Sequence, residues 1–549
     1  METIRKENNL SRLSLTIMLV SLLISCSLLI FKDPYYGHDI GFHLSRIKSI
    51  ADCFSNHTFP ALIYPNYFDG YGYANGIFYP DLFLYIPGLM VFLGLDCKLA
   101  YHIFVFIINV ATLLSMYFCI NRICSNKSVS AIISSIFLLS SYRLTDLYIR
   151  SALGETLCFV FMPFVVLGLY EILYKDFKKG YYLTIGLTGI MFSHVITIVF
   201  CVILVFLDYL IRLISLRKEI KQRTIYLSLY CLIAAGITSC FTLPLIEMML
   251  SDTFMYKVNP ATGGFDRTIP FILSIIEIPT YQDEFFPQGI GLVFIFLFGL
   301  FFYIKNKKSY NNIFVSDFLI LGFIFLILST GLFPWRLLSG FAQTIQFPWR
   351  FLVCSTACLL FAIAPVLEEL FVSPKKEKVL SLVLSGFICF TVLCVTANIF
   401  IIHDFKLYED DIHYSLGGIE YLPADTDTEI IKNRGEICSS NNNISISFTR
   451  QGTIFEIEYD NNSYDDTYIE IPLIYYKGYK AKENKKELEV LKGENGIVRV
   501  IPNNSNGSIK LYYGFSSIRI AGIVLSVLSV ILFFYFQKKN NKLASFPDN

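Results

Sequence analysis

Three polar residues near the start of the chain have types and a spacing suited to proton transfer. His38, Asp39 and His43 lie within six residues, directly after the first long apolar stretch. If this segment is helical, Asp39 and His43 are four positions apart and share one face. A carboxylate at the edge of a membrane helix, partly buried beside an imidazole, can acquire the pKa that a general base needs. A polar cluster that only caps the helix explains the same spacing, so both interpretations stay open.

Two arginines and two acids form a second group of candidates. Arg143, Asp146, Arg150 and Glu155 flank the ends of two neighbouring apolar stretches, on the side of the membrane that most basic residues of this chain avoid. A guanidinium fork matches the oxygens of a phosphate group, so this segment predicts phosphate recognition. Internal pairing of the arginines with the acids is an almost equally good interpretation.

Four further residues complete the predicted set of substrate-binding residues. They are Asp81, His194, Glu247 and Arg350, the last beside one of only two tryptophans. Asp81 begins a short apolar helix, where an N-cap is the simpler role. A charge at the bilayer centre costs about 2.5 to 3.5 kcal/mol, so we expect these groups to face a cavity or the interface. All candidates fall on one predicted side of the membrane, which indicates a single outward-facing site.

The elements that must position these residues are membrane-spanning helices. Hydrophobic residues make up 54% of the 549 residues and charged residues only 16%, against about 25% charged in soluble domains. The apolar residues fall in blocks of about 20, the length that crosses a hydrocarbon core of about 30 Å. The composition therefore excludes a soluble enzyme, and a net charge of +1 does not indicate nucleic acid as a partner.

We predict a mainly α, polytopic helix bundle of twelve spans with both termini in the cytoplasm. The spans are residues 13–31, 99–120, 129–142, 156–174, 182–193, 195–212, 225–248, 289–304, 313–330, 351–370, 379–402 and 517–536. The positive-inside rule places every short basic connection, such as Arg122 with Lys127, in the cytoplasm. The apolar stretch 81–95 then cannot be a full crossing, because it would move the Arg122 connection outside. Its length and Pro87 predict an interfacial or re-entrant helix.

The chain divides into three predicted regions. Residues 1–402 form the transmembrane domain, with a first outer loop at 32–98. Residues 403–515 contain runs in which apolar and polar residues alternate, separated by Asn and Gly, which predicts a small extracytoplasmic β-sandwich-like domain. Residues 516–549 form the last span and a cytoplasmic tail. Cys53, Cys97 and Cys438 lie in segments predicted to be outside, so a disulfide among them is one possibility.

Several longer strings resemble a known family. They are GHDIGFHLSRI, GYGYANGIFYPDLFLYIPGL, YRLTDLYIRSALGE, GLTGIMFSHV, QFPWRF, EYLPADT and IPLIYYKGYKA. Together they resemble a bacterial membrane family often labelled 6-pyruvoyl-tetrahydropterin synthase-related, and they are similar to the YfhO group within the GT-C glycosyltransferase superfamily. The resemblance covers nearly the whole chain, from residue 37 to about residue 513. Nothing in the chain reads as a soluble pterin fold.

The resemblance implies a GT-C type fold and an inverting sugar transfer. GT-C enzymes have an acidic catalytic residue in the first outer loop, followed by an interfacial helix, and Asp39 with residues 81–95 matches this layout. The implied donor is a polyprenyl-phosphate-linked sugar in the cell membrane, and the acceptor is an envelope polymer or lipid on the extracytoplasmic face. By this analogy Asp39 deprotonates the acceptor hydroxyl, and the departing phosphate is held by Arg143, Arg150, His194 or Arg350.

The resemblance implies no cofactor for this chain. Many GT-C members have two adjacent acids in the first loop, whereas here Asp39 stands between His38 and Ile40. A bridging divalent metal is therefore not supported. The chain also has no Walker A loop, no HExxH motif and no GxSxG motif, which removes the usual support for ATP-driven transport and for zinc proteolysis.

Two other functions stay open. One is a transporter or flippase of a lipid-linked envelope precursor, and the other is a non-catalytic membrane scaffold whose β domain binds envelope polymer. Transporters place their binding groups near the middle of the membrane, often in repeated halves. In this chain the polar groups gather at the predicted outer ends of the helices, which favours the transferase.

Overall fold

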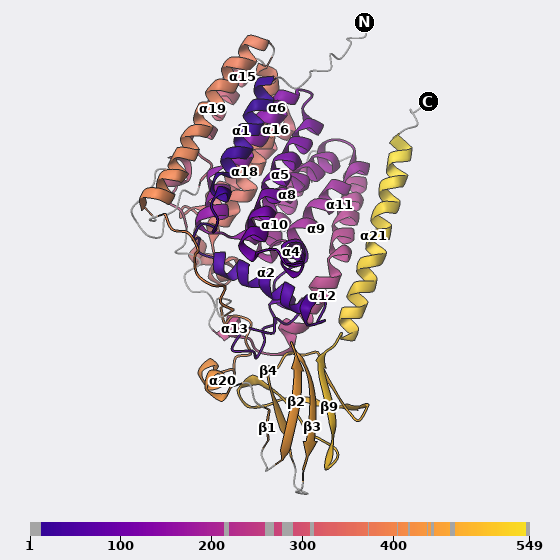
Figure 1. Cartoon of the computed structure of the whole chain (residues 1–549). Coiled ribbons are helices and arrows are strands. Elements are labelled where there is room, and N and C mark those ends of the chain that lie inside the picture. Colours follow the sequence, from indigo (N-terminus) through magenta and orange to yellow (C-terminus); the bar gives the residue numbers. More distant parts are fainter. Residues whose placement is uncertain are drawn as a thin grey trace.

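The protein consists of a long helical bundle with a small β domain at one end (Figure 1). The computed structural model describes residues 12–213, 219–258, 268–276, 289–307, 312–371, 373–402, 405–414, 418–435, 438–440, 444–461 and 467–544. The ends of the chain predicted to lie in the cytoplasm, 1–11 and 545–549, are outside these residues. The start of α1 and the end of α21 lie at the same end of the bundle, away from the β domain (Figure 1). That arrangement agrees with an even number of crossings.

Each of the twelve predicted spans coincides with a helix or with a bent pair of helices. They are α1 (Arg12–Ser25), α5 (Cys97–Ile123), α6 (Lys127–Leu138) with α7 (Ser141–Leu144), α8 (Leu153–Tyr174), α9 (Tyr181–Met191), α10 (Val195–Leu213), α11 (Ile220–Ile237) with α12 (Ser239–Ser251), α15 (Leu292–Lys307), α16 (Ile313–Ser329), α18 (Leu352–Leu370), α19 (Pro374–Ala397) and α21 (Ser517–Ala544). Among the described residues, six helices are long and apolar enough to cross a membrane, or eight with the two bent pairs. The chain is therefore a membrane protein, while the count of twelve and the sidedness stay predictions.

The break after α6 is the feature that positions the candidate site. The axis bends by 48° between residues 127–138 and 141–149. After α7 the chain continues in a π-helical turn, η3 (Thr145–Ile149), and then reaches Ser151 at φ 51°. π-turns and left-handed non-glycine residues are uncommon in ordinary helices and redirect the chain that follows. Here they turn Arg150 and Ser151 toward the loop that precedes α2.

The first outer loop holds two short helices that pack on each other. α2 (Ile40–Ser55) follows Asp39, and α4 (Tyr85–Phe92) follows the 3-10 turn η2 (Leu82–Leu84). Gly88 lets them approach closely, because a Cβ there would lie 2.5 Å from Ile50. With eight residues, α4 is about 12 Å long, too short to cross a bilayer. This agrees with the interfacial or re-entrant helix predicted for 81–95.

The small β domain that the alternating pattern predicts is confirmed. Among the described residues of this domain, five strands form one antiparallel sheet in the order β2 (Ser445–Gln451), β3 (Ile454–Asp460), β9 (Asn506–Tyr513), β5 (Tyr479–Glu483), β6 (Lys486–Leu488). Four form the other, in the order β1 (Ser439–Ser440), β4 (Ile469–Ile474), β8 (Ile497–Val500), β7 (Val490–Lys492). On β3, the side chains of Phe455, Ile457 and Tyr459 are buried and the residues between them are exposed. The period of two thus selects which face of the sheet is buried.

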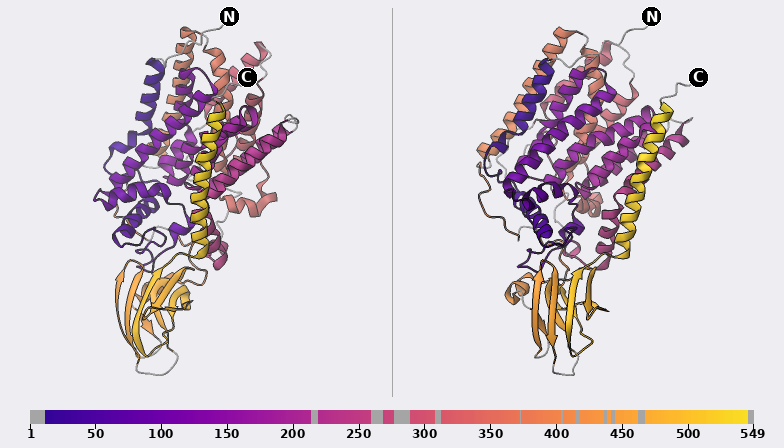
Figure 2. Two further views of the ribbon diagram at one scale, coloured as in Figure 1. Left: turned by 90° about the vertical axis from the view of Figure 1, so that its right-hand side faces the viewer. Right: turned by 45° about the vertical axis from the view of Figure 1, so that its right-hand side comes forward.

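The β domain packs against the first outer loop beneath the bundle, and α21 runs back along the side of the helices (Figure 2). The hydroxyl of Tyr71 donates to the carbonyl of Gly435 at 2.7 Å, and the carbonyl of Tyr71 accepts from the backbone N–H of Ile474 at 2.8 Å. All fourteen cysteines are free, so the possible disulfide among Cys53, Cys97 and Cys438 is not formed. The domain is held to the bundle by backbone and aromatic contacts and by ion pairs such as Nζ of Lys492 with Oδ2 of Asp252 at 2.6 Å.

Candidate functional site

Asp39 lies where the loop before α2 meets the segment after η3. The backbone N–H of Asp39 donates to the carbonyl of Arg150 at 2.9 Å, and that of His38 donates to the carbonyl of Ile149 at 3.1 Å. These two hydrogen bonds join segments that are more than 100 residues apart in the chain. The pairing places the candidate base beside the predicted phosphate-binding arginine.

Gly37 is the residue that permits this pairing. A Cβ at position 37 would lie 2.1 Å from Oγ of Ser151 and 2.6 Å from the carbonyl oxygen of Tyr148, and the second neighbour is backbone. We expect Gly37→Ala to separate the two segments and to cost about 1 to 3 kcal/mol of stability, the usual effect of overpacking. Thermal unfolding in detergent measures the loss. Gly299→Ala is the matched control, because nothing lies within 4 Å of a Cβ there; equal melting temperatures for the two variants would contradict the prediction.

Glu155 joins the charged residues of this region into one cluster. Its carboxylate accepts two hydrogen bonds from Arg150, Nη1 to Oε2 at 2.8 Å and Nη2 to Oε1 at 2.9 Å. Arg350 donates from Nε to Oε1 at 2.8 Å, and the hydroxyl of Tyr142 donates to Oε2 at 3.0 Å. Asp146 accepts from Arg150 at 2.6 Å. We call Tyr142, Asp146, Arg150, Glu155 and Arg350 the Glu155 cluster. Arg150 pairs with Asp146 and Glu155 in it, which is one of the two interpretations that the sequence allowed.

Asp39 differs from the other acids beside this cluster. Its side chain is half-buried and makes no hydrogen bond or ion pair with any residue in the described part of the chain. Burial raises the pKa of Asp39 above the ordinary 3.8, and Glu155 adds to this effect while Arg150 and Arg350 oppose it. Its oxygens are therefore free to accept a proton from a bound hydroxyl group.

The two arginines of the cluster keep donors that no described residue uses. Arg150 binds carboxylates through Nη1 and Nη2 and leaves Nε without a partner. Arg350 uses Nε and Nη1, the latter toward the carbonyl of Ile345 and the side chain of Gln346, and leaves Nη2. Both guanidinium groups lie over the ring of Phe347, at 5.6 Å and 4.6 Å from its centre. Two donor nitrogens, Nε of Arg150 and Nη2 of Arg350, thus remain for the oxygens of an anionic ligand.

Two of the three predicted histidines, His43 and His194, are buried. Nε2 of His43 accepts the backbone N–H of Leu153 at 3.2 Å, which connects α2 with the start of α8. Burial, together with the neighbouring Arg46, holds the pKa of His43 well below its ordinary 6.5, so the ring is neutral. Nδ1 of His194 lies 2.9 Å from the hydroxyl of Thr197. The exposed His38 is at the surface of the same loop.

Two further predicted site residues, Arg143 and Asp81, also make no hydrogen bond or ion pair with the Glu155 cluster in the described structure. Arg143 is fully buried and donates to Asn109 at 2.6 Å and to the carbonyl of Leu138 at 2.9 Å. Asp81 accepts from Arg46 and Tyr64, both at 2.5 Å, and does not cap its helix. The structure thus turns Arg143 toward α5 and uses Asp81 to hold the outer loop together.

Glu247 also lies apart, at the junction of α12, α21 and the β domain. It accepts from the hydroxyl of Ser516 and lies 3.3 Å from Nζ of Lys477. Several neutral or aromatic residues of the site were missed by sequence reasoning, namely Tyr142, Gln346 and Phe347, because nothing in their type marks them as functional. Arg46 was detectable, since it follows His43 by three positions on the same helix.

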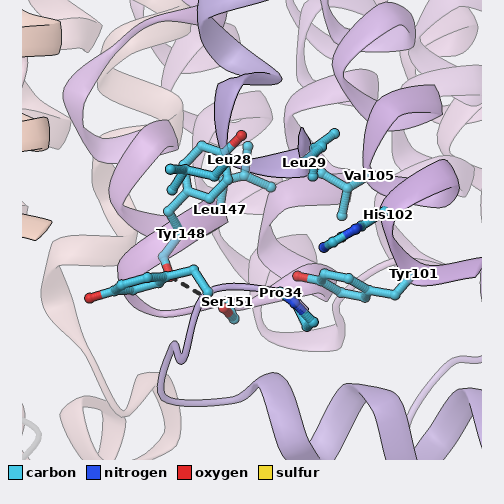
Figure 3. Close-up of a pocket in the computed structure, with 10 residues that line it drawn as sticks. Leu28, Leu29, Pro34, Tyr101, His102, Val105, Leu147, Tyr148 and Ser151 are labelled. Carbon is cyan, nitrogen blue, oxygen red and sulfur yellow. Dashed lines mark hydrogen bonds between the residues drawn. The ribbon is translucent and has the colours of Figure 1, made fainter. Parts of the chain in front are cut away.

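A small cavity borders the segment that carries Ser151 (Figure 3). Apolar side chains from α5 and from the end of the first span line part of it. The polar lining includes the imidazole of His102 and the hydroxyl groups of tyrosines and Ser151. The lining residues are Leu28, Leu29, Pro34, Tyr35, Tyr101, His102, Val105, Leu147, Tyr148 and Ser151. Among the residues described, no group of three or more His, Cys, Asp or Glu side chains is arranged to hold a metal ion.

Comparisons with known proteins leave the family open. No family model matches the chain. It is 24% identical over 329 residues to an uncharacterized protein of Lactococcus lactis subsp. cremoris (strain MG1363), across 55% of this chain and 52% of that protein, so the match spans about half the relative's length. The fold is similar at a TM-score of 0.38 and 12% identity to the oligosaccharyltransferase of Archaeoglobus fulgidus in its apo form, over 75% of this chain and 57% of that one. A likeness this remote carries no argument, and membership of the YfhO-like and GT-C families stays a prediction from the sequence.

Proposed function

We propose that this protein is a membrane glycosyltransferase that moves a sugar from a polyprenyl-phosphate donor to a cell-envelope acceptor, with Asp39 as the general base. One observation carries the proposal. Asp39 is a half-buried carboxylate without a partner among the described residues, and it lies beside two arginines that keep free donors. A base next to an anion-binding pair is the arrangement that transfer from a phosphate leaving group requires.

The reaction follows from this arrangement. Asp39 accepts the proton of the acceptor hydroxyl. At the same time the acceptor oxygen forms a bond to the anomeric carbon of the sugar. The bond between that carbon and the phosphate oxygen breaks, and the electron pair stays on the phosphate. Arg150 and Arg350 then stabilise the added negative charge, which is greater in the transition state than in the donor. Attack from the face opposite the leaving group inverts the configuration at the anomeric carbon.

Glu155 is a positioning residue in this proposal. It binds one guanidinium through two hydrogen bonds and the other through one, so it orients both relative to Phe347. A fixed donor is worth more than a mobile one, because it needs no reorganisation when charge develops. The acids also offset the charge of the arginines before the substrate binds, which lowers the cost of burying them.

The donor class rests on the membrane setting of the site. A lipid-linked sugar presents its phosphate at the surface of the bilayer, next to the helix ends where Asp39 and the Glu155 cluster lie. The cavity of Figure 3, with its wall of leucine and valine side chains, borders the same segment. The sequence resemblance to GT-C enzymes supports the same donor class.

A transfer assay tests the proposal. Purified protein in lipid nanodiscs is incubated with radiolabelled polyprenyl-phosphate sugars and, in parallel, with nucleotide sugars, each with envelope extract as acceptor. We expect label in the acceptor fraction only with the lipid-linked donors. Absence of transfer from every donor would overturn the proposal. In sealed proteoliposomes, a lipid-linked donor that crosses the bilayer without chemical transfer would favour the flippase.

The pH dependence of transfer gives a second test. Only ionised Asp39 can act as a base, and burial raises its pKa above 3.8. The pH dependence of kcat/KM reports ionisations of the free enzyme. We therefore expect kcat/KM to fall with decreasing pH on a limb centred above 3.8, and we expect Asp39→Asn to lack that limb. Because the folded protein holds this proton more tightly than the unfolded chain, ionisation of Asp39 lowers stability as pH rises through the same range. A limb centred at or below 3.8 would contradict the assignment.

A further inference from the structure

A second buried polar cluster lies at the far end of α8, the helix that carries Glu155 in its first turn. It contains Tyr174, the last residue of α8, with Asp208 near the end of α10 and Asp317 near the start of α16. Glu155 and Tyr174 are separated by 19 positions on α8, about 28 Å along the helix axis. α8, α10 and α16 run along the length of the bundle (Figure 1). The proposed transfer reaction uses none of these three residues.

The hydrogen atoms of this cluster can be counted. The hydroxyl oxygen of Tyr174 lies 2.6 Å from Oδ1 of Asp208 and 3.0 Å from Oδ2 of Asp317. A phenol has one hydrogen and can donate to only one of these oxygens. If both acids were ionised, the other short contact would join two oxygen atoms with no hydrogen between them. One carboxyl group must therefore carry a proton and donate it to the phenol oxygen.

The charges identify which acid carries the proton. Nη1 of Arg212 lies 3.7 Å from Oδ2 of Asp317, so this carboxylate has a cation beside it. Asp208 is fully buried, has no ion pair in the described structure, and its Oδ2 has no hydrogen-bond partner there. An ionised Asp208 would have no ion-pair partner in the described structure, and its Oδ2 would have no hydrogen-bond donor. The carbonyl oxygen of a neutral acid can be buried without a donor at far lower cost.

We propose that Asp208 is a proton-binding site, in which its protonated carboxyl donates to Tyr174 and Tyr174 donates to Asp317, whose charge Arg212 balances. The hydroxyl of Tyr174 accepts one hydrogen bond from Asp208 and donates one to Asp317, so the two hydrogen bonds polarise each other. The ligand is a single proton shared by a coupled pair of acids. The inference is independent of the transferase proposal, since no residue is common to both.

The surroundings of Asp208 leave one route for the proton. Cys358 faces it from α18, and the other titratable neighbours are the three members of the relay. Asp208 is fully enclosed, but Tyr174 is half-buried and its ring lies 4.7 Å below the guanidinium of Arg212. The proton therefore enters and leaves past Tyr174, at the end of the bundle away from Asp39.

Infrared spectroscopy of the full chain in nanodiscs tests the proposal, because a protonated carboxyl has a carbonyl stretch that a carboxylate lacks. At neutral pH we expect a protonated-carboxyl band that is lost in Asp208→Asn and kept in Asp176→Asn. Asp176 is the matched control because its half-buried carboxylate lies two residues after α8 and pairs with Lys179. Asp208→Asn should keep the melting temperature of the parent, since an amide mimics the neutral acid, whereas Asp208→Ala should lower it.

A second variant keeps the test decisive if Asp208→Asn does not fold. Tyr174→Phe removes the acceptor of the proton, so the carbonyl band should shift in frequency in that variant. Two results would overturn the proposal. One is a spectrum in which Asp208→Asn removes no protonated band, and the other is a band whose frequency is unchanged by Tyr174→Phe.

Discussion

Asp39→Asn is expected to lower kcat for sugar transfer by about 10²- to 10⁴-fold, the contribution that a positioned general base typically makes. An amide has the shape of the carboxylate but cannot accept the proton of the acceptor hydroxyl. The backbone hydrogen bond from position 39 to Arg150 does not involve the side chain, so the fold and the donor affinity should be retained. Transfer of label from a lipid-linked donor, measured under single-turnover conditions, reports the loss.

Asp69→Asn is the matched control for this change. Asp69 lies in the same outer loop, is exposed, and has φ 52°, a conformation that Asn adopts readily. It should transfer sugar at the parental rate. Asp39→Glu should recover part of the activity, because it restores a base at a displaced position. Parental rates in Asp39→Asn would refute the role of Asp39, even if the protein proved to be a transferase.

Glu155→Gln is expected to destabilise the protein by about 3 to 5 kcal/mol. Glu155 is the partner of two buried arginines, and removal of one member of a buried ion pair leaves an uncompensated charge. Its side chain is only 6% exposed, so water cannot replace the lost interaction. A neutral amide also donates where the carboxylate accepted, which places N–H groups against N–H groups. The shift of the unfolding transition in detergent measures the loss.

Two further variants test whether the loss of stability comes from the uncompensated charges of the arginines or from substitution of any glutamate. Glu369→Gln changes an exposed glutamate on α18 and should alter stability by less than about 0.5 kcal/mol. Adding Arg350→Met to Glu155→Gln removes one of the stranded charges and should restore part of the stability. A loss below about 1 kcal/mol for Glu155→Gln alone would contradict the prediction, because it would mean that other groups balance the charges of Arg150 and Arg350.

The candidate site was only partly accessible from the sequence. The string from Arg143 to Glu155 offered phosphate recognition and internal pairing as alternatives, and the structure combines paired carboxylates with two unused donors. Arg143 and Arg150 were predicted together, yet they turn to different partners. The cause is the π-turn at Thr145–Ile149, which lies between the two arginines and changes the helical phase from one to the other. The conformational propensities of residues 145–149 do not predict a π-turn.

The sequence by itself determined the membrane character of the chain, the position of each long helix and the strand-rich nature of the C-terminal domain. These properties depend on local composition: an apolar run of about 20 residues must cross or enter a bilayer, and an alternating run must form a half-buried strand. Only the tertiary structure decided which charges meet. Asp39 with Arg150, and Tyr174 with Asp208 and Asp317, are brought together by the packing of helices. Hydrophobic burial selects a face of each helix but no particular neighbour, because it has no direction.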